Sequence, residues 1–217
     1  MSSWDLRRDK ANTIVVRKPE VLARAMQGSD PMFKPLVEVY KPAHGMVLYN
    51  CKVFDVAAGL VRSVQFLLPS DSTLIPMEGQ YGQQVLCESE ESFMDALEAV
   101  LDIWRTEVAK KSATPSDTVP IESVPALRGG AVYASWNWKS KEVFAGVEAL
   151  VNSGQQATLM LNGVTFNKAK NSVTAKLALS QFPYGMRRRL SHAAPVAASL
   201  EILDTQAEEE KSGASSE

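Results

Sequence analysis

The sequence predicts an α+β fold of mainly antiparallel sheet with about three helices, and three observations support this prediction. One long segment repeats apolar residues at helical spacing, and several short segments are rich in β-branched and aromatic residues. Pro, Gly, Asn or Asp residues separate these short segments, as expected for strands joined by turns. Of the 217 residues, 45% are hydrophobic, which is enough material for a substantial core.

The longest helix is predicted near residues 92–110, in the stretch "SFMDALEAVLDIWRTEVAKK". Its apolar residues recur every three or four positions, so one face is expected to be buried against the sheet. These residues are Phe93, Leu97, Val100, Leu101, Trp104 and Val108. Ser92 is the expected N-cap, with acidic residues near the start and lysines near the end.

Two shorter helices are predicted from the same signals. In "KPEVLARAMQG", Pro19 suits the first turn and Gly28 suits the exit. In "SKEVFAGVEALVNSG", Ser140 is the expected cap and Gly154 the expected stop. The buried face of this second helix is expected to carry Phe144, Val147 and Val151.

Eight segments are predicted to be strands because they combine β-forming residues with flanking turn signals. They are "NTIVV", "LVEVY", "GMVLYNCKVF", "LVRSVQFLL", "QQVLC", "AVYASWNW", "ATLMLNG" and "SVTAKLAL". The clearest hairpin is "VTFNKAKNSVTAKLAL", in which apolar and other residues alternate after a polar tip.

The chain is expected to fall into two α+β halves joined by a proline-rich crossing, "SATPSDTVPIESVPALRGG". Each half reads as strand, helix and then several strands, so an internal duplication is one possibility. The predicted divisions are a flexible N-terminus (1–12), a first half (13–111), the crossing (112–130), a second half (131–203) and a disordered acidic tail (204–217).

Composition excludes several classes of protein. Two cysteines, Cys51 and Cys87, are too few for a disulfide scaffold, so both are expected to be reduced and buried. No apolar run is long enough to cross a bilayer, which predicts a cytoplasmic protein, with a nuclear or virion-associated location as alternatives. No glycine-rich nucleotide motif and no paired metal-ligand motif occurs, so neither a cofactor nor a metal is expected.

Catalysis has only weak candidates. His44 could act as base for a Cys51 nucleophile, but a cysteine in an alternating strand is usually a small buried hydrophobe. Glu90 and Glu91 could act as acid and base, but a charge pair at a helix start explains them more simply. We therefore expect no enzyme, with a dispersed thiol or carboxylate site as the alternative.

Basic residues give a candidate site for an anionic partner. Arg187, Arg188 and Arg189 are consecutive in "GMRRRLSHAAP", and Lys168 and Lys170 lie at the tip of the hairpin that leads to them. Such clusters bind phosphates through charge neutralisation and counterion release, so RNA is the expected partner. The alternative is that the arginines form a solvated chain end.

The stretch "RRRLS" resembles the acceptor sequence of basophilic, cyclic-AMP-dependent-type serine kinases, with Ser191 as the acceptor. The resemblance implies that phosphorylation of Ser191 would place negative charge beside the arginines and weaken binding of phosphates there.

Trp136 and Trp138 lie two residues apart in a predicted strand and so share one face. An exposed pair would form a stacking platform for unpaired bases. Core packing is the favoured interpretation, because large aromatic side chains chiefly supply buried area.

The net charge of −2 is distributed unevenly along the chain. Residues 204–217 hold five carboxylates and one lysine, a net charge of −4, which leaves +2 on the preceding residues. The favoured interpretation is a binding or assembly protein that self-associates and contacts RNA, such as a viral coat, matrix or movement protein. A host-directed protein-interaction module is a further alternative.

Overall fold

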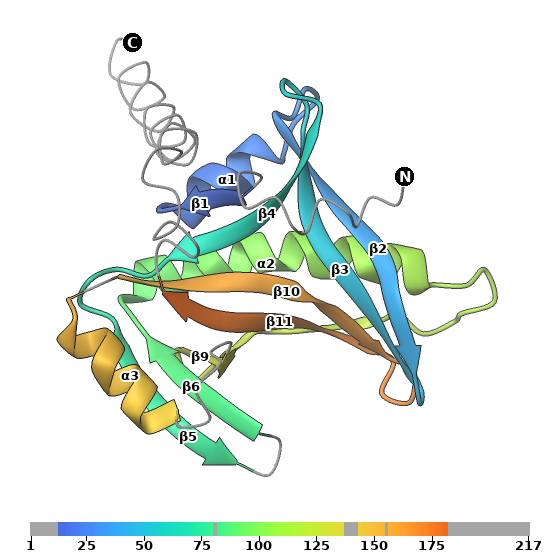
Figure 1. Cartoon of the computed structure of the whole chain (residues 1–217). Helices are drawn as coiled ribbons and strands as arrows, with labels where there is room; N and C mark the ends of the chain where they lie inside the picture. The colour runs from blue at the N-terminus through green and yellow to red at the C-terminus, as the bar shows by residue number, and fades with distance from the viewer. Residues whose placement is uncertain (1–12, 80–81, 137–142, 155, 182–217) are drawn as a thin grey trace.

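A computed structural model of the chain describes residues 13–79, 82–136, 143–154 and 156–181. In these residues the chain has an α+β fold, with three helices and one curled sheet of eleven strands that forms a half-barrel (Figure 1). The predicted fold class is confirmed. In chain order the elements are β1 (Thr13–Val16), α1 (Pro19–Ala25), β2 (Phe33–Ala43), β3 (Met46–Asp55), β4 (Leu60–Leu67), β5 (Thr73–Gly79), β6 (Gly82–Glu88), α2 (Glu91–Ser112), β7 (Glu122–Val124), β8 (Leu127–Arg128), β9 (Ala131–Trp136), α3 (Val143–Asn152), β10 (Ala157–Asn167) and β11 (Ser172–Gln181).

The sheet interleaves strands from both sides of the proline-rich crossing. Its main order is β1-β4-β3-β10-β11-β9-β6-β5, with β2 paired to β3, β7 to β11 and β8 to β9. Most neighbours are antiparallel, whereas β1–β4, β7–β11 and β9–β11 are parallel. Strand β10 therefore lies beside β3 and β4, which precede it in the chain by about a hundred residues.

Helix α2 runs along one face of the sheet (Figure 1). Leu97 and Trp104 are completely buried, as the helical spacing predicts. The indole Nε1–H of Trp104 donates to the carbonyl of Lys52 at 2.9 Å, which fixes the helix to β3. Helix α1 packs against α2, and Pro19 occupies its start as expected.

The start of α2 differs from the prediction. The helix begins at Glu91, and Glu90 is the N-cap with φ −57° and ψ 145°, so Ser92 lies inside the first turn. The Glu90 side chain makes no capping hydrogen bond. The Glu91 carboxylate instead lies near the positive end of the helix dipole, which stabilises this end electrostatically.

The buried face of α3 also differs from the prediction. Val147 is buried, but Phe144 and Val151 are 52% and 59% exposed, and Val143 and Leu150 are buried in their place. The helix has apolar residues on two adjacent faces, so spacing alone does not select one. The choice follows from Gly146, where an added Cβ would lie 2.4 Å from the Trp136 ring, so the helix backbone packs directly on this indole.

Three of the observed strands are not predicted from the sequence. Strand β5 contains Pro76, which lacks an N–H and is tolerated at the sheet edge where this strand lies. Strands β7 and β8 are only three and two residues long and lie within the proline-rich crossing. None of the helices in the described ranges is long and apolar enough to cross a bilayer.

The predicted β10–β11 hairpin is confirmed, and a glycine allows it to pack closely on β3. Gly163 has φ +143°, and an added Cβ would lie 2.3 Å from the carbonyl oxygen of Tyr49. Only glycine fits this close approach, which occurs at a β-bulge between Leu161 and Gly163. The bulge therefore positions the end of the hairpin beside β3.

Candidate nucleic-acid interface

Two hairpin tips meet at one end of the sheet, where β2–β3 and β10–β11 lie side by side (Figure 1). Met46, the first residue of β3, pairs with Asn167, the last residue of β10. Beyond this pair, the backbone N–H of Lys168 donates to the carbonyl of Gly45 at 2.8 Å. This hydrogen bond holds the two turns together.

Local sequence explains the shape of both turns. His44 and Gly45 have φ of 35° and 78° and join the paired residues Ala43 and Met46, as in a two-residue hairpin turn with positive φ at both positions. In the second turn, the Asn167 Oδ1 accepts the Lys170 backbone N–H at 3.1 Å. Such a side-chain bond to the backbone is typical of asparagine in turns.

The proline-rich crossing supports the second turn from beside it. Asn171, with φ 50°, donates through Nδ2 to the carbonyls of Val119 and Pro120 at 3.3 and 3.2 Å. Its own carbonyl accepts the backbone N–H of Glu122 at 2.9 Å. The tip of the β10–β11 hairpin is thus held between β3 and the crossing.

The joined tips gather four exposed side chains, Lys41, His44, Lys168 and Lys170, which we call the hairpin-tip patch. The segments 40–49 and 164–173 contain no acidic residue. Glu122 is the nearest acidic residue by register, because it pairs with Ser172 at the side of the patch. Three lysines, one on β2 and two in the β10–β11 turn, can bind the phosphates of a polyanion without contacting its bases.

The structure places the predicted basic residues only in part. Lys168 and Lys170 lie at the hairpin tip as expected, whereas Arg187, Arg188, Arg189, Ser191 and Trp138 lie outside the described residues. Lys41 and His44 are members that the sequence prediction missed. They lie more than 120 residues from Lys168, and only the β3–β10 pairing brings them together.

Trp136 is a core residue in this fold. It is 9% exposed and packs on Gly146 of α3. This arrangement favours the core-packing interpretation over a stacking platform, because an unpaired base would need access to the face of the ring.

The structure does not bring His44 to Cys51. His44 lies at the hairpin tip, whereas Cys51 is buried in β3, roughly 16 Å beyond Met46 at the usual rise of a strand. The Cys51 Sγ lies 3.8 Å from the carbonyl of Tyr49, and burial raises the pKa of its thiol strongly. Burial likewise raises the pKa of Cys87 to about 12. Both thiols are protonated packing residues at neutral pH.

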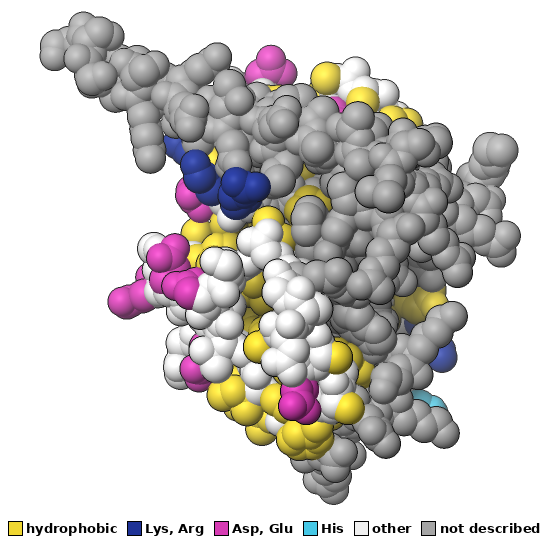
Figure 2. Space-filling model, turned by 60° about the vertical axis from the view of Figure 1, so that its left-hand side comes forward, with side chains coloured by type: hydrophobic (Ala, Val, Ile, Leu, Met, Phe, Trp, Pro, Cys, Tyr) yellow, Lys and Arg dark blue, Asp and Glu magenta, His cyan; other side chains and the backbone are white. Residues whose placement is uncertain are grey.

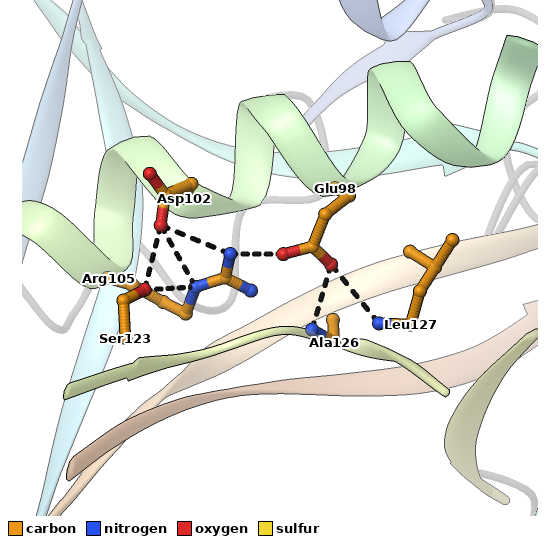
Figure 3. A network of polar contacts seen from close by, with 6 residues as sticks. All are labelled: Glu98, Asp102, Arg105, Ser123, Ala126 and Leu127. Carbon is orange, nitrogen blue, oxygen red and sulfur yellow. Dashed lines mark hydrogen bonds and ion pairs between the residues drawn. The ribbon is translucent and has the colours of Figure 1, made fainter. Parts of the chain in front are cut away.

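A second polar cluster, the Arg105 network, joins α2 to the crossing (Figure 3). Arg105 is buried, and its guanidinium forms ion pairs with Glu98 and with Asp102, the latter at 3.1 Å. Its Nε donates to the Ser123 hydroxyl at 2.9 Å, and this hydroxyl donates to Asp102 at 2.7 Å. Glu98 accepts two backbone N–H groups of the crossing, from Ala126 at 2.8 Å and Leu127 at 3.1 Å.

The Arg105 network is a structural clamp that also supports the segment beside the hairpin-tip patch. Ser123 belongs to β7, and the residues just before β7 accept the hydrogen bonds of Asn171. The clamp therefore holds the segment that supports the second turn. Its sequence signal is the spacing of Glu98, Asp102 and Arg105, which puts three ionisable groups on one side of α2.

No group of three or more potential metal ligands gathers within the described ranges. No protein-family model, curated protein sequence or solved structure matches this chain. Its function is therefore inferred from the chemistry of its own side chains.

Proposed function

We propose that this chain is a non-enzymatic binding and assembly protein that contacts RNA through the hairpin-tip patch. The observation that carries the proposal is the joining of two hairpin turns, which gathers lysines from distant parts of the sequence on one acid-free projection. We propose Arg187, Arg188 and Arg189, which follow β11 in the sequence, as further phosphate contacts separate from the patch. A viral coat, matrix or movement protein is the class of protein that suits this chemistry.

The test of RNA binding is a salt titration with a twelve-nucleotide oligouridylate. The double variant Lys168→Gln/Lys170→Gln removes two phosphate contacts, so binding should weaken and the slope of log K against log salt should fall by about 1.4. The matched control is Lys34→Gln/Lys110→Gln, which removes the same charge from exposed lysines elsewhere, Lys34 near the far end of β2 and Lys110 at the end of α2. Identical slopes for the two double variants would contradict the proposal.

Self-association has separate support from the opposite end of the sheet. Ile75, Leu86 and Tyr133 form one cross-strand row on β5, β6 and β9, and Ile75 and Tyr133 are 41% and 38% exposed. Figure 2, which turns the side of the molecule with α3 and β5 forward, shows further hydrophobic side chains on the lower part of the surface. An exposed apolar row of this kind is typical of a protein interface.

The partner that fits this row is a second copy of the chain. Arg128 lies over the Tyr133 ring at 5.9 Å, and by register Glu88 lies on the same face two strands away, so two copies related by a twofold axis could pair Arg128 with Glu88. Sedimentation should show concentration-dependent association that Ile75→Lys weakens and the exposed α2 substitution Asp95→Lys does not. A monomer at all concentrations would contradict this assembly mode.

A further inference from the structure

The β2–β3 hairpin exposes large apolar side chains directly beside the lysines of the patch. Val39, Tyr40 and Met46 are 56%, 49% and 45% exposed, and we call these three residues the apolar margin. Lys41 follows Tyr40 directly, and Met46 is two residues after His44. A surface that bound phosphates alone would gain nothing from this exposed apolar area, which costs free energy in water.

Tyr40 has a special position within the apolar margin. In the β2–β3 ladder, Val39 pairs with Tyr49 and Lys41 pairs with Leu48, so Tyr40 is the extra residue of a β-bulge. A bulge re-aims a side chain away from the regular alternation of a strand, and bulges are enriched next to functional sites. Strand β2 pairs only with β3, so its other side has no partner strand in the described part of the chain.

We propose that the hairpin-tip patch binds single-stranded rather than double-stranded RNA, with a base stacked on Tyr40 while Lys41, Lys168 and Lys170 hold the neighbouring phosphates. This inference rests on the proposed function and specifies its ligand. Unpaired bases offer flat apolar faces that stack on aromatic side chains, whereas a duplex covers these faces and presents mainly phosphates and sugars. Tyr40 lies about 13 Å from His44 along the strand, which is a span that a few nucleotides can cover.

The decisive experiment compares the affinities of the protein for two ligands of equal charge. One is a twelve-nucleotide oligouridylate, and the other is an abasic ribose-phosphate chain of the same length. Because stacking is commonly worth about 1–3 kcal/mol per base, the parent protein should bind the oligouridylate about 5-fold or more tightly than the abasic chain. Binding to a twelve-base-pair RNA duplex, which covers the base faces, should be unchanged by loss of the Tyr40 ring.

Three variants test the role of Tyr40. Tyr40→Leu keeps apolar area but removes the ring, so it should abolish the preference for oligouridylate without changing the salt slope. Tyr40→Phe keeps the ring and should retain the preference. Phe144→Leu removes an aromatic ring of 52% exposure from α3, which belongs to neither the patch nor the self-association row, and should also retain it.

The outcomes separate this inference from the proposed function. Equal binding of oligouridylate and abasic chain by the parent, or a preference that survives Tyr40→Leu, would overturn the stacking site while leaving phosphate binding intact. Absence of salt-dependent binding to any of the RNA probes would overturn both. Binding to anionic phosphatidylserine vesicles in preference to RNA would also overturn the inference, because lysines beside exposed apolar side chains can serve a membrane surface instead.

Discussion

The two cysteines show how the surroundings of a side chain set its reactivity. Burial raises the pKa of both thiols, that of Cys87 to about 12. Because the thiolate is the nucleophile, only about one Cys87 thiol in ten thousand is reactive at pH 8. We expect native protein to react very slowly with Ellman's reagent at pH 8 and both thiols to react at once in 6 M guanidinium. Rapid reaction of folded protein would show that the strands around them open readily.

The same burial makes stability depend on pH. The folded protein holds the Cys87 thiol protonated, whereas the unfolded chain releases the proton near pH 9. The free energy of unfolding therefore keeps its full contribution from this group below pH 9 and declines as the pH rises towards 12. At pH 10.5 the loss should be about 2 kcal/mol of unfolding free energy. Guanidinium unfolding of the parent and of Cys87→Ala measures this loss, because the stability gap between them should narrow by that amount from pH 7 to pH 10.5.

The side chain of Glu98 holds part of the proline-rich crossing in place. Glu98→Ala removes the acceptor of the Ala126 and Leu127 backbone N–H groups and leaves the buried Arg105 without one of its two carboxylates. We expect faster hydrogen exchange at Ala126 and Leu127 and a loss of about 3–5 kcal/mol in stability. Glu107→Ala removes another carboxylate of α2, whose partner Lys110 is exposed, and should change neither quantity measurably. Equal exchange rates in both variants would contradict the clamp.

At the scale of elements, the close approach of β10 to β3 depends on one residue. Gly163→Ala would place a Cβ against the Tyr49 carbonyl in a backbone region that favours glycine, so the strands must separate and the hairpin tips must shift. Gly59→Ala is the matched control, because Gly59 has φ +66° and open space around its Cα. Thermal melts should show a cost of about 1 kcal/mol for Gly59→Ala and a clearly larger cost for Gly163→Ala. Similar costs would mean that the backbones are not in contact there.

The elements that sequence reasoning predicts are those with a strong local pattern. Helix α2 and the β10–β11 hairpin follow directly from apolar spacing and alternation. Strand β5 is missed because Pro76 breaks the local strand signal, which the sheet edge tolerates. The buried face of α3 is missed because Gly146 has no side chain to reveal that Trp136 packs there. Local signals therefore identify elements better than they identify which surfaces meet.

At the scale of the whole molecule, long-range strand pairing creates the candidate site. Lys168 and Lys170 can be selected from the sequence because they are charges at a hairpin tip. Lys41, His44 and Tyr40 cannot, because their connection to that tip is the pairing of β3 with β10. The division of the chain into two halves at the crossing stays a prediction, and in the one sheet β10, β11 and β9 from the second side lie between β3 and β6 from the first.

The charge layout of the whole chain gives a final prediction. Residues 204–217 carry a net charge of −4 on a chain whose other residues total +2, so we expect this acidic segment to compete with RNA for the basic residues. Deleting residues 204–217 should tighten binding of the oligouridylate, most clearly at low salt where the attraction is least screened. Replacing Arg187, Arg188 and Arg189 by Gln should weaken binding similarly for different RNA sequences and lower the salt slope. A matched control replaces the five carboxylates of the segment by Gln and Asn at unchanged length, which should reproduce the deletion because charge rather than chain length causes the competition. Identical salt titrations for the parent, the triple-Gln variant and the deletion would leave the three arginines as a solvated segment with no role in binding.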